Sequence, residues 1–401
     1  MKKRILFIMP SMFIGGAERS LLGLLDVIDY SQYDVSLFLL RHEGEFLPLI
    51  PQEVKILSPI KEYATFDVPI AGLLKSQLWR FGVARILGKL CLRHLKNKQP
   101  DTGIWASMQY TSRSLLPLLP NIPGEYELAI TFLGIPDVLL EKVKSKKKIA
   151  WNHTDYTILG PDKAYDRELH QKLDFIVSVS ETCTGQLLKS YPELTEKAIT
   201  IENVLSKRLM ELQANAFTVE REMPDDRTIK LLSIGRFSNP KNFDNVPDIC
   251  RRILKAGLDI KWYLIGYGGD EPLIRQRIQE AGMEDRVIIL GKKENPYPYI
   301  KACDLYVQPS RYEGKAVTVR EAQMLCKPVM ITRYATSASQ LEDGVDGVIV
   351  PMENEGCAEG VVRLLKDPEQ MQRLSAACAR RDYTNAQEVE KIYKVLEIQS
   401  R

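Results

Sequence analysis

The chain has 401 residues, more than a single hydrophobic core usually holds, so its length predicts two domains. A net charge of only +3 argues against nucleic acid as a partner of the whole chain, and 45% hydrophobic residues are ordinary for a globular protein. The seven scattered cysteines include no CxxC pair, which argues for a reducing compartment and against a disulfide framework or a zinc site.

The first segment, residues 1–17, has a basic head and an apolar run, as a signal peptide has. We favour a β-strand over 4–9, because Pro10 interrupts the apolar run and helical periodicity follows it. No apolar stretch approaches the ~18 residues that span a bilayer. Further strands of the first half are predicted at 34–40, 127–133, 147–152 and 175–180.

Two turns of the first half carry candidate binding residues. Gly15 and Gly16 precede a helix, whose free N–H groups and positive dipole end suit a phosphate or a sugar hydroxyl. The alternative is a plain strand-to-helix turn. His153 directly follows the strand at 147–152, so it is a candidate for contact with a ligand, or else a structural histidine.

The segment from Leu73 to Lys98 is basic and lacks acidic residues. A helix over this segment would form a basic stripe opposite an apolar face, the pattern of a helix that lies on an anionic membrane. The alternative is an ordinary domain helix with its apolar face in the core. The stripe holds Lys75, Arg85, Lys89, Arg93 and Lys96, and the apolar face holds Trp79, Val83, Ile86, Leu87 and Leu90.

A polar stretch at about 205–228, without periodicity, is interpreted as the linker between the halves. Beyond it, apolar strands again alternate with amphipathic helices. This rhythm predicts parallel sheets covered by helices on both faces, with ligands beyond the carboxyl ends of the strands. The predicted strands are 229–235, 260–266, 286–291, 305–310, 328–333 and 347–351.

Several of these strands end in residues suited to a phosphorylated ligand. Arg236 and Lys241 follow the first of them, and a guanidinium with an ammonium can hold a diphosphate. Gly266, Gly268 and Gly291 follow the next two strands and would bring the backbone close to a ligand. Solvated cations and ordinary turns are the alternatives.

The stretch SRYEGKAVTVREAQML holds two glutamates eight positions apart. Glu313 is expected in the loop after a strand and Glu321 in the second turn of a helix that begins near Val317. Two carboxylates suit the vicinal hydroxyls of a sugar and a ribose; an N-terminal helix acid and a solvated acid are the alternative. The sequence has no Asp-x-Asp triplet and no cluster with metal-ligand spacing, so we expect no metal and no cofactor.

With these motifs the chain resembles retaining glycosyltransferases of family 4, which have the GT-B fold: two Rossmann-like parallel-sheet domains facing across a cleft. The resemblance covers essentially the whole chain. The motifs that carry it are GGAERSLLGLL from Gly15, NHTDY around His153, SIGRFSNPKN, LIGYGGDEP and YEGKAVTVREAQ, the last with the family's E-x7-E pattern.

The resemblance implies roles for the candidate residues. Glu313 would contact hydroxyls of the donor sugar, and Glu321 would contact the nucleotide ribose. Arg236 and Lys241 would hold the diphosphate. Gly16 would approach the diphosphate from the other domain, and His153 would meet the donor sugar or the acceptor. The backbone between Val287 and Gly291 would hold the base.

One departure from the family pattern concerns the donor sugar. After the Glu-Gly pair that ends at Gly314, the family often has Phe followed by Gly or Pro, whereas this chain has Lys315 and Ala316. These positions lie beside the donor sugar in the family. The variant resembles bacterial capsule and exopolysaccharide glycosyltransferases.

The resemblance thus predicts a metal-independent, retaining hexosyltransferase that uses a nucleotide diphosphate sugar, with a UDP-sugar expected, and a glycan or lipid-linked acceptor. Such an enzyme would work in the cytoplasm, peripherally on the inner face of the bacterial plasma membrane. We expect an acceptor domain at 1–205, a donor-binding domain at 206–380 and a C-terminal helix at 381–401 that can return to the first domain. The alternatives are a glycogen- or sucrose-type synthase with a soluble acceptor, and a non-catalytic protein that binds sugar nucleotides.

Overall fold

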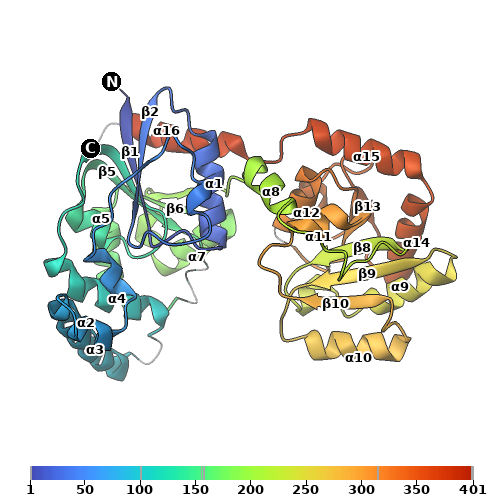
Figure 1. Ribbon diagram of the computed structural model, residues 1–401, viewed down its shortest axis with the longest axis horizontal. Coiled ribbons are helices and arrows are strands. Elements are labelled where there is room, and N and C mark those ends of the chain that lie inside the picture. The colour runs from blue at the N-terminus through green and yellow to red at the C-terminus, as the bar shows by residue number, and fades with distance from the viewer. Residues whose placement is uncertain (1, 100–101, 155, 157–158, 314–315, 399–401) are drawn as a thin grey trace. The chain divides into compact units, whose positions relative to one another are not determined.

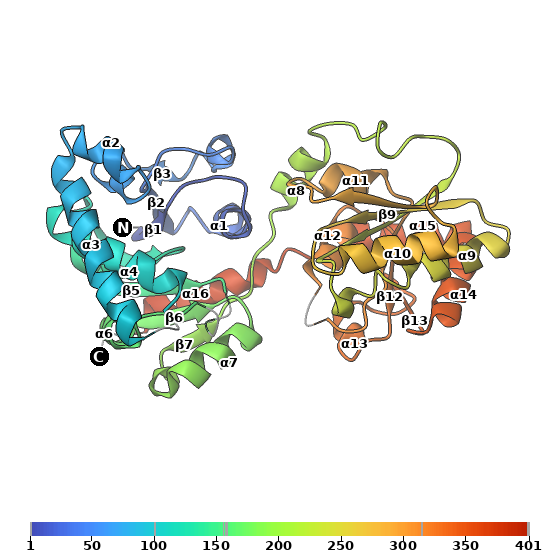
Figure 2. The same ribbon diagram turned by 90° about the horizontal axis from the view of Figure 1, so that it is seen from below.

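The computed structural model describes residues 2–99, 102–154, 156, 159–313 and 316–398. The chain divides into two compact units, the first formed by Met1–Ser206 with Asn385–Arg401 and the second by Lys207–Thr384. Each unit is built on one parallel sheet with helices packed against it (Figures 1 and 2). The prediction of two parallel-sheet α/β units is therefore confirmed.

The first unit has a seven-stranded, all-parallel sheet. Its strands are β1 (Lys3–Met9), β2 (Tyr33–Leu39), β3 (Lys55–Ile56), β4 (Glu125–Thr131), β5 (Lys144–Asn152), β6 (Phe175–Ser178) and β7 (Ala198–Thr200). The strand order is β3-β2-β1-β4-β5-β6-β7, so the winding reverses between β1 and β4. The sequence did not predict β3 and β7, because strands of two or three residues are too short to show a hydrophobic pattern.

The other elements of this unit that the structure describes are helices and short 3-10 turns. They are α1 (Gly16–Val27), η1 (Leu47–Leu49), η2 (Tyr63–Phe66), α2 (Ile70–Leu74), α3 (Trp79–Lys98), α4 (Ile104–Leu115), η3 (Leu116–Leu118), α5 (Asp137–Lys142), α6 (Lys163–Lys172), α7 (Glu181–Ser190), η5 (Pro192–Leu194), η7 (Ala386–Glu388) and α16 (Val389–Glu397). The last two come from the end of the chain, and Tyr393 of α16 stacks on Tyr33 of β2 with ring centroids 4.4 Å apart.

The helix predicted over Leu73 to Lys98 is interrupted. It consists of the end of α2 and the whole of α3, which are joined through Ser76: its hydroxyl donates to the carbonyl of Leu73 and accepts from the N–H of Leu78. α3 packs on α4, and the two lie side by side in Figures 1 and 2. Among the helices that the structure describes, none is long and apolar enough to cross a membrane.

The second unit has a six-stranded sheet, also parallel throughout its named pairs. Its strands are β8 (Ile229–Ile234), β9 (Ile260–Ile265), β10 (Val287–Gly291), β11 (Leu305–Gln308), β12 (Val329–Thr332) and β13 (Val348–Val350). All six coincide with predicted strands, because buried strands of parallel sheets are continuous apolar runs that can be recognised locally. The order is β10-β9-β8-β11-β12-β13, and the winding reverses between β8 and β11.

The helices of this unit surround a core that contains Trp262, Phe237 and Phe243. They are α8 (Lys207–Ala214), η6 (Asn239–Lys241), α9 (Val246–Lys255), α10 (Glu271–Ala281), α11 (Tyr297–Ala302), α12 (Val317–Met324), α13 (Ser337–Gln340), α14 (Asn354–Leu365) and α15 (Pro368–Arg380).

The stretch interpreted as a linker, 205–228, is a structured part of the second unit, so that interpretation was wrong. It contains α8, which buries Leu209 and Met210 and packs on α11. Glu222, further along, pairs with Lys293 at 2.6 Å. The eight residues of α8 give only two helical turns, too few for their periodicity to stand out from the polar sequence around them.

The buried carboxyl group of Asp137 makes the stability of the first unit depend on pH. Asp137 begins α5, is 1% exposed, and accepts hydrogen bonds from Ser112 Oγ and from the N–H of Val138 at 2.6 and 2.8 Å. Burial outweighs these bonds and raises the pKa of Asp137 to about 6. The folded state therefore binds this proton more tightly than the unfolded chain does.

Between pH 4 and pH 6 the folded state holds more protons at Asp137, so the free energy of unfolding falls as pH rises, by about 3 kcal/mol. Asp137→Asn should remove this dependence. Urea unfolding of the two proteins at pH 4.5 and pH 7.5 measures it. Exposed Glu45 supplies the control, Glu45→Gln, which should keep the wild-type slope. An unchanged slope in Asp137→Asn would contradict the assignment.

Candidate active site

Three charged candidate residues of the second unit lie in the loops at the carboxyl ends of β8 and β11. These are the neighbouring strands between which the winding of the sheet reverses, and ligands of open parallel sheets bind outside such a point. Arg236 and Lys241 lie in the loop after β8, and Glu313 lies in the loop after β11. The fold therefore brings Lys241 into contact with Glu313, which lies 72 residues further along the chain, and Arg236 lies in the same loop as Lys241.

Hydrogen bonds hold the loops after β8 and β11 against each other. Asn242 has a left-handed φ of 62°, and its side-chain amide donates to the carbonyl of Pro309 at 2.8 Å. The N–H of Arg311 donates to the carbonyl of Pro240 at 2.8 Å. The Arg311 guanidinium also binds both carboxylate oxygens of Asp244, at 2.8 and 2.7 Å. Sequence reasoning missed Arg311 and Asp244, because nothing in the local pattern pairs residues so far apart.

Lys241 and Glu313 form an ion pair with 2.6 Å between Nζ and Oε1. The Glu313 side chain is only 8% exposed, and the same Oε1 also accepts from Ser310 Oγ at 2.6 Å and from Gln308 Nε2 at 3.2 Å. None of these bonds uses Oε2. Among the described residues the carboxylate is thus held by one oxygen, and the other is left to accept a hydrogen bond from a hydroxyl group.

Glu321 lies in the second turn of α12, as predicted, and is nearly buried. The phenol of Tyr297, at the start of α11, donates to Glu321 Oε1 at 2.9 Å. Tyr297 is itself buried, so this contact restrains the carboxylate. Sequence reasoning missed Tyr297, which lies 24 residues from its partner.

Arg236 is exposed at the same sheet edge, and no described carboxylate forms an ion pair with it. Gly266 and Gly268 follow β9 with φ of 151° and 158°. A Cβ atom at these two positions would lie 1.8 Å from the carbonyl oxygen of Gly235 and 2.2 Å from that of Phe237, so close packing of two loops requires glycine there. This packing does not test the predicted role of Gly266 and Gly268 in donor binding, which stays a prediction.

The structure separates the two residues that were predicted to border the base. Gly291 ends β10 at the carboxyl edge with a φ of 71°, whereas Val287 begins the strand and its side chain is in the core. Val287 and Gly291 are at opposite ends of β10, so only Gly291 lies at the carboxyl edge of the sheet. Gly314 and Lys315, also predicted to bind the donor, lie outside the described residues.

In the first unit, Gly15 and Gly16 form the start of α1. Gly15 is the N-cap residue without a side-chain cap, and Gly16 is exposed with open space around its Cα. The carboxylate of Glu18 folds back over this helix end, since a Cβ on Gly15 would lie 2.1 Å from Glu18 Oε2. Burial raises the pKa of Glu18. A phosphate that approached this helix end would meet the Glu18 carboxylate there.

His153 follows β5, and its Nε2 lies 2.9 Å from the carbonyl oxygen of Phe132, which follows β4. A carbonyl only accepts, so Nε2 carries the proton and Nδ1 is left as an acceptor. Burial lowers the pKa of His153 to about 4. The imidazole is therefore neutral at pH 7 and can orient a hydroxyl group, but it offers no positive charge to a phosphate.

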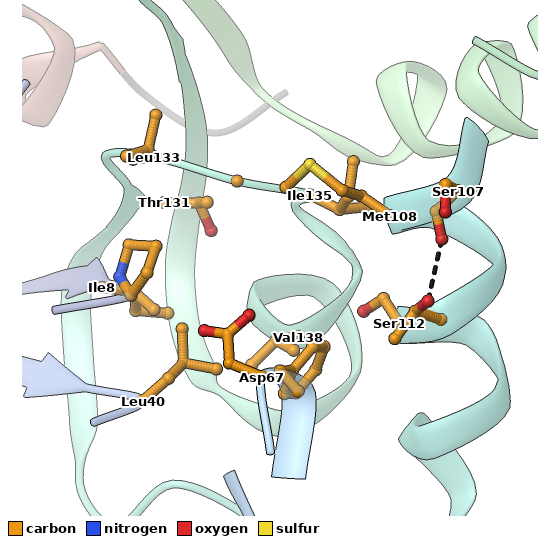
Figure 3. Close-up of a pocket in the computed structure, with 14 residues that line it drawn as sticks. Ile8, Leu40, Asp67, Ser107, Met108, Ser112, Thr131, Leu133, Ile135 and Val138 are labelled. Carbon is orange, nitrogen blue, oxygen red and sulfur yellow. Dashed lines mark hydrogen bonds between the residues drawn. The ribbon is translucent and has the colours of Figure 1, made fainter. Parts of the chain in front are cut away.

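Sequence reasoning missed a pocket at the carboxyl edge of the first sheet. It encloses about 180 Å³ beside β1 and β4, the strands between which the winding reverses. Its walls come from the ends of β1, β2 and β4, from the end of η2 with Asp67 after it, and from α4 and α5 (Figure 3). Ile8, Leu40, Ile135 and Val138 make much of the surface apolar.

Polar groups enter this pocket from two sides. Thr131, the last residue of β4, is 2% exposed, and its hydroxyl has no hydrogen-bond partner among the described residues. Asp67 lies across the pocket from it (Figure 3) and is 3.3 Å from the guanidinium of Arg41. A buried hydroxyl without a partner is costly, which suggests that a ligand satisfies it. The only sequence signal was a threonine at a strand end.

Comparison with known proteins agrees with this architecture. Residues 217–381 match the family "Glycosyl transferases group 1". The chain is 29% identical to an alpha-D-kanosaminyltransferase of Streptomyces kanamyceticus over 83% of this chain and 87% of that protein. It is 26% identical to the N-acetylgalactosamine-N,N'-diacetylbacillosaminyl-diphospho-undecaprenol 4-alpha-N-acetylgalactosaminyltransferase of Campylobacter jejuni, over 50% of this chain and 53% of that one.

Among solved structures, Anabaena HepE in complex with UDP and glucose matches 98% of this chain and 99% of its own, with a TM-score of 0.56 and 16% identity. This likeness shows the fold, two Rossmann-like sheets as in GT-B glycosyltransferases. Arg236, Lys241, Glu313 and Glu321 all fall inside the matched segment. Over residues 217–381, which lie in the second unit, the chain is therefore similar to the glycosyl transferases group 1 family.

Proposed function

We propose that this protein is a retaining glycosyltransferase that moves a sugar from a nucleotide diphosphate sugar, with UDP as the expected nucleotide, to a glycan or lipid-linked acceptor of the bacterial surface. The observation that carries the proposal is the Lys241–Glu313 pair, which lies where the winding of the second sheet reverses and within the family segment. This arrangement offers a cation for a phosphate beside a carboxylate for a sugar hydroxyl.

The donor would bind at this edge through charge-assisted hydrogen bonds. Lys241 has three N–H donors and gives one to Glu313, so two remain for the diphosphate. Arg236 is exposed at the same edge and can add a planar pair of donors. Glu313 Oε2 would accept from a hydroxyl of the donor sugar, and Glu321 from the ribose. HepE, the fold relative, was solved with UDP and glucose, which supports a UDP-sugar.

The acceptor would enter the pocket of the first unit. Thr131 offers a hydroxyl without a partner and Asp67 a carboxylate, both of which suit the hydroxyls of a sugar ring, and the apolar wall suits a ring face. The pocket is smaller than the roughly 300 Å³ at which sites for drug-sized ligands begin, so it fits one ring of a longer acceptor. The Campylobacter relative, by its name, acts on a diphospho-undecaprenol glycan, which supports a lipid-linked acceptor.

The reaction would be a same-face substitution. The acceptor oxygen forms the new bond to the anomeric carbon of the sugar while the bond from that carbon to the phosphate oxygen breaks. The acceptor proton passes to the departing phosphate, and Lys241 and Arg236 stabilise the charge that remains. Protein catalysis then consists of positioning and electrostatic stabilisation, without a metal or an enzymic nucleophile.

A panel of nucleotide sugars tests this function. We expect UDP-sugars to raise the melting temperature, since a ligand at 100 times its Kd adds about 2.7 kcal/mol to stability. The donor that stabilises best is then incubated with glycan and lipid-linked acceptors, with and without EDTA. The product should keep the anomeric configuration of the donor by NMR.

Three outcomes would contradict parts of the proposal. Binding without transfer to any acceptor would favour a non-catalytic protein. Inversion of the anomeric centre would exclude the retaining reaction. Activity that EDTA abolishes and a divalent ion restores would exclude the metal-independent mechanism.

A further inference from the structure

One face of α3 is buried inside the first unit. Phe81, Gly88 and Leu92 are buried on this face. A Cβ atom on Gly88 would lie 2.8 Å from the carbonyl oxygen of Tyr110 and from the hydroxyl oxygen of Ser114, both in α4, so glycine allows the two helices to approach closely. The inward side of α3 is thereby defined, and the other side faces away from the unit.

The outward side of α3 is apolar and exposed. Trp79, Leu87 and Leu90 are 52%, 56% and 56% exposed, and Val83 and Ile86 are each more than a third exposed. At 3.6 residues per turn these five side chains share one face, as predicted. The alternative interpretation, a domain helix with this face in the core, is wrong, because Phe81, Gly88 and Leu92 take the inward position instead. A helix that faced only water would carry polar residues here.

The flanks of this apolar face are cationic. Arg80, Lys89, Arg93 and Lys96 are exposed, and none forms an ion pair with a described carboxylate. No acidic residue occurs from 68 to 100. Two members of the predicted stripe do not belong to it: Lys75 lies in the break before α3, and Arg85 is half-buried and donates to the carbonyls of Thr65 and Val68.

We propose that α3 lies in the surface of an anionic lipid bilayer, with Trp79, Leu87 and Leu90 at the acyl boundary and the lysines and arginines among anionic headgroups. The charge pattern distinguishes a bilayer from a second copy of the chain as the partner of this face. In a two-fold dimer through this face the same cations would meet each other and repel. A bilayer surface supplies both the apolar layer and the negative charge. The inference does not rest on the proposed sugar transfer.

The test uses the full chain and sedimentation with vesicles of phosphatidylcholine alone or with phosphatidylglycerol, at 0.1 M and 1 M salt. Wild type should bind only the anionic vesicles, and less at 1 M, where the Debye length falls from ~10 Å to ~3 Å. Lys89→Glu with Arg93→Glu should lower binding about 30-fold or more, since removing two attractions of about 1 kcal/mol each already gives that factor. Leu87→Gln with Leu90→Gln should lower it about as much.

Matched double variants on the second unit are the controls. Leu212→Gln with Leu273→Gln removes two exposed leucines, and Lys255→Glu with Lys366→Glu makes the same change in net charge. Both should bind vesicles as wild type does, and circular dichroism should show that all four variants are folded. Equal losses in the controls, or negligible binding of wild type to anionic vesicles at 0.1 M, would overturn the proposal.

Fluorescence reports the depth of α3. Trp79 is the most exposed of the tryptophans, because Trp151 and Trp262 are buried and Trp105 is half-buried. Anionic vesicles should shift the emission to the blue in wild type but not in Trp79→Phe. Without lipid the protein should sediment as the same species with and without the Leu87 and Leu90 substitutions. If these substitutions instead dissociate a dimer, a second copy of the chain covers the face and the membrane proposal fails.

Discussion

Glu313→Gln is expected to lower kcat by about 100-fold while changing affinity for the free nucleotide diphosphate little. Glu313 is held through Oε1 by Lys241, Ser310 and Gln308, which leaves Oε2 for the proposed contact with the donor sugar. A charge-assisted hydrogen bond that strengthens in the transition state is worth about 3 kcal/mol, and this corresponds to the expected factor. The free nucleotide lacks the sugar, so it does not report this contact.

Glu321→Gln, in contrast, should weaken the binding of the free nucleotide diphosphate. Glu321 is fixed by Tyr297 and is proposed to bind the ribose, which the free nucleotide and the sugar nucleotide share. Both ligands should therefore bind more weakly by a similar factor. Calorimetric titration of the two ligands, with steady-state kinetics, measures the difference; Glu353→Gln, on an exposed acid of the same unit, is the control. Equal loss of free-nucleotide affinity in both variants would refute the separate roles.

Lys241→Met should both weaken nucleotide diphosphate binding, by roughly 2 kcal/mol, and destabilise the second unit, by about 3 kcal/mol. The destabilisation arises because Glu313 would remain nearly buried without its cation. Lys241→Met combined with Glu313→Gln removes the uncompensated charge, so this double variant should regain most of the stability. It should regain none of the activity, because both ligand contacts are gone.

Urea unfolding and nucleotide titration separate these two effects. Lys255→Met makes the same substitution on an exposed lysine of α9 and should cost less than about 0.5 kcal/mol. Lys241→Met that is no less stable than this control would show that the pair contributes nothing to folding. A double variant as unstable as Lys241→Met alone would show that packing, rather than charge, was lost.

The sequence predicted the residues at the strand ends better than the contacts among them. Arg236, Lys241 and Glu313 were selected because each follows an apolar run, and parallel strands bring their carboxyl ends to one edge. That inference needs only local patterns and the rule for parallel sheets. The resemblance assigned contact with the base to the whole backbone from Val287 to Gly291. These residues form one strand, and only Gly291 lies at the carboxyl edge, so Val287 was misplaced.

The basic segment from Leu73 to Lys98 shows both what local patterns predict and what they leave open. Helical periodicity correctly grouped Trp79, Leu87 and Leu90 on one face, since the repeat of 3.6 residues is a local property. Whether that face lay inside or outside was undecided by the sequence, because an apolar stripe is equally typical of a core helix. Packing of Gly88 against α4 places the apolar face on the outside. The contact of Arg85 with Thr65 and Val68 removes that cation from the basic stripe.

By itself, the amino-acid sequence determined the parallel α/β class, the second-half strands and the residues that follow them, because hydrophobic runs and glycine-rich turns are encoded locally. Only the tertiary structure decided the contacts that make a site: the Arg311–Asp244 pair, the support of Glu321 by Tyr297, and the pocket with Thr131 and Asp67. Each joins residues that are 24 or more positions apart. Such contacts depend on the order of the strands in the sheet, and no local pattern of residues encodes that order.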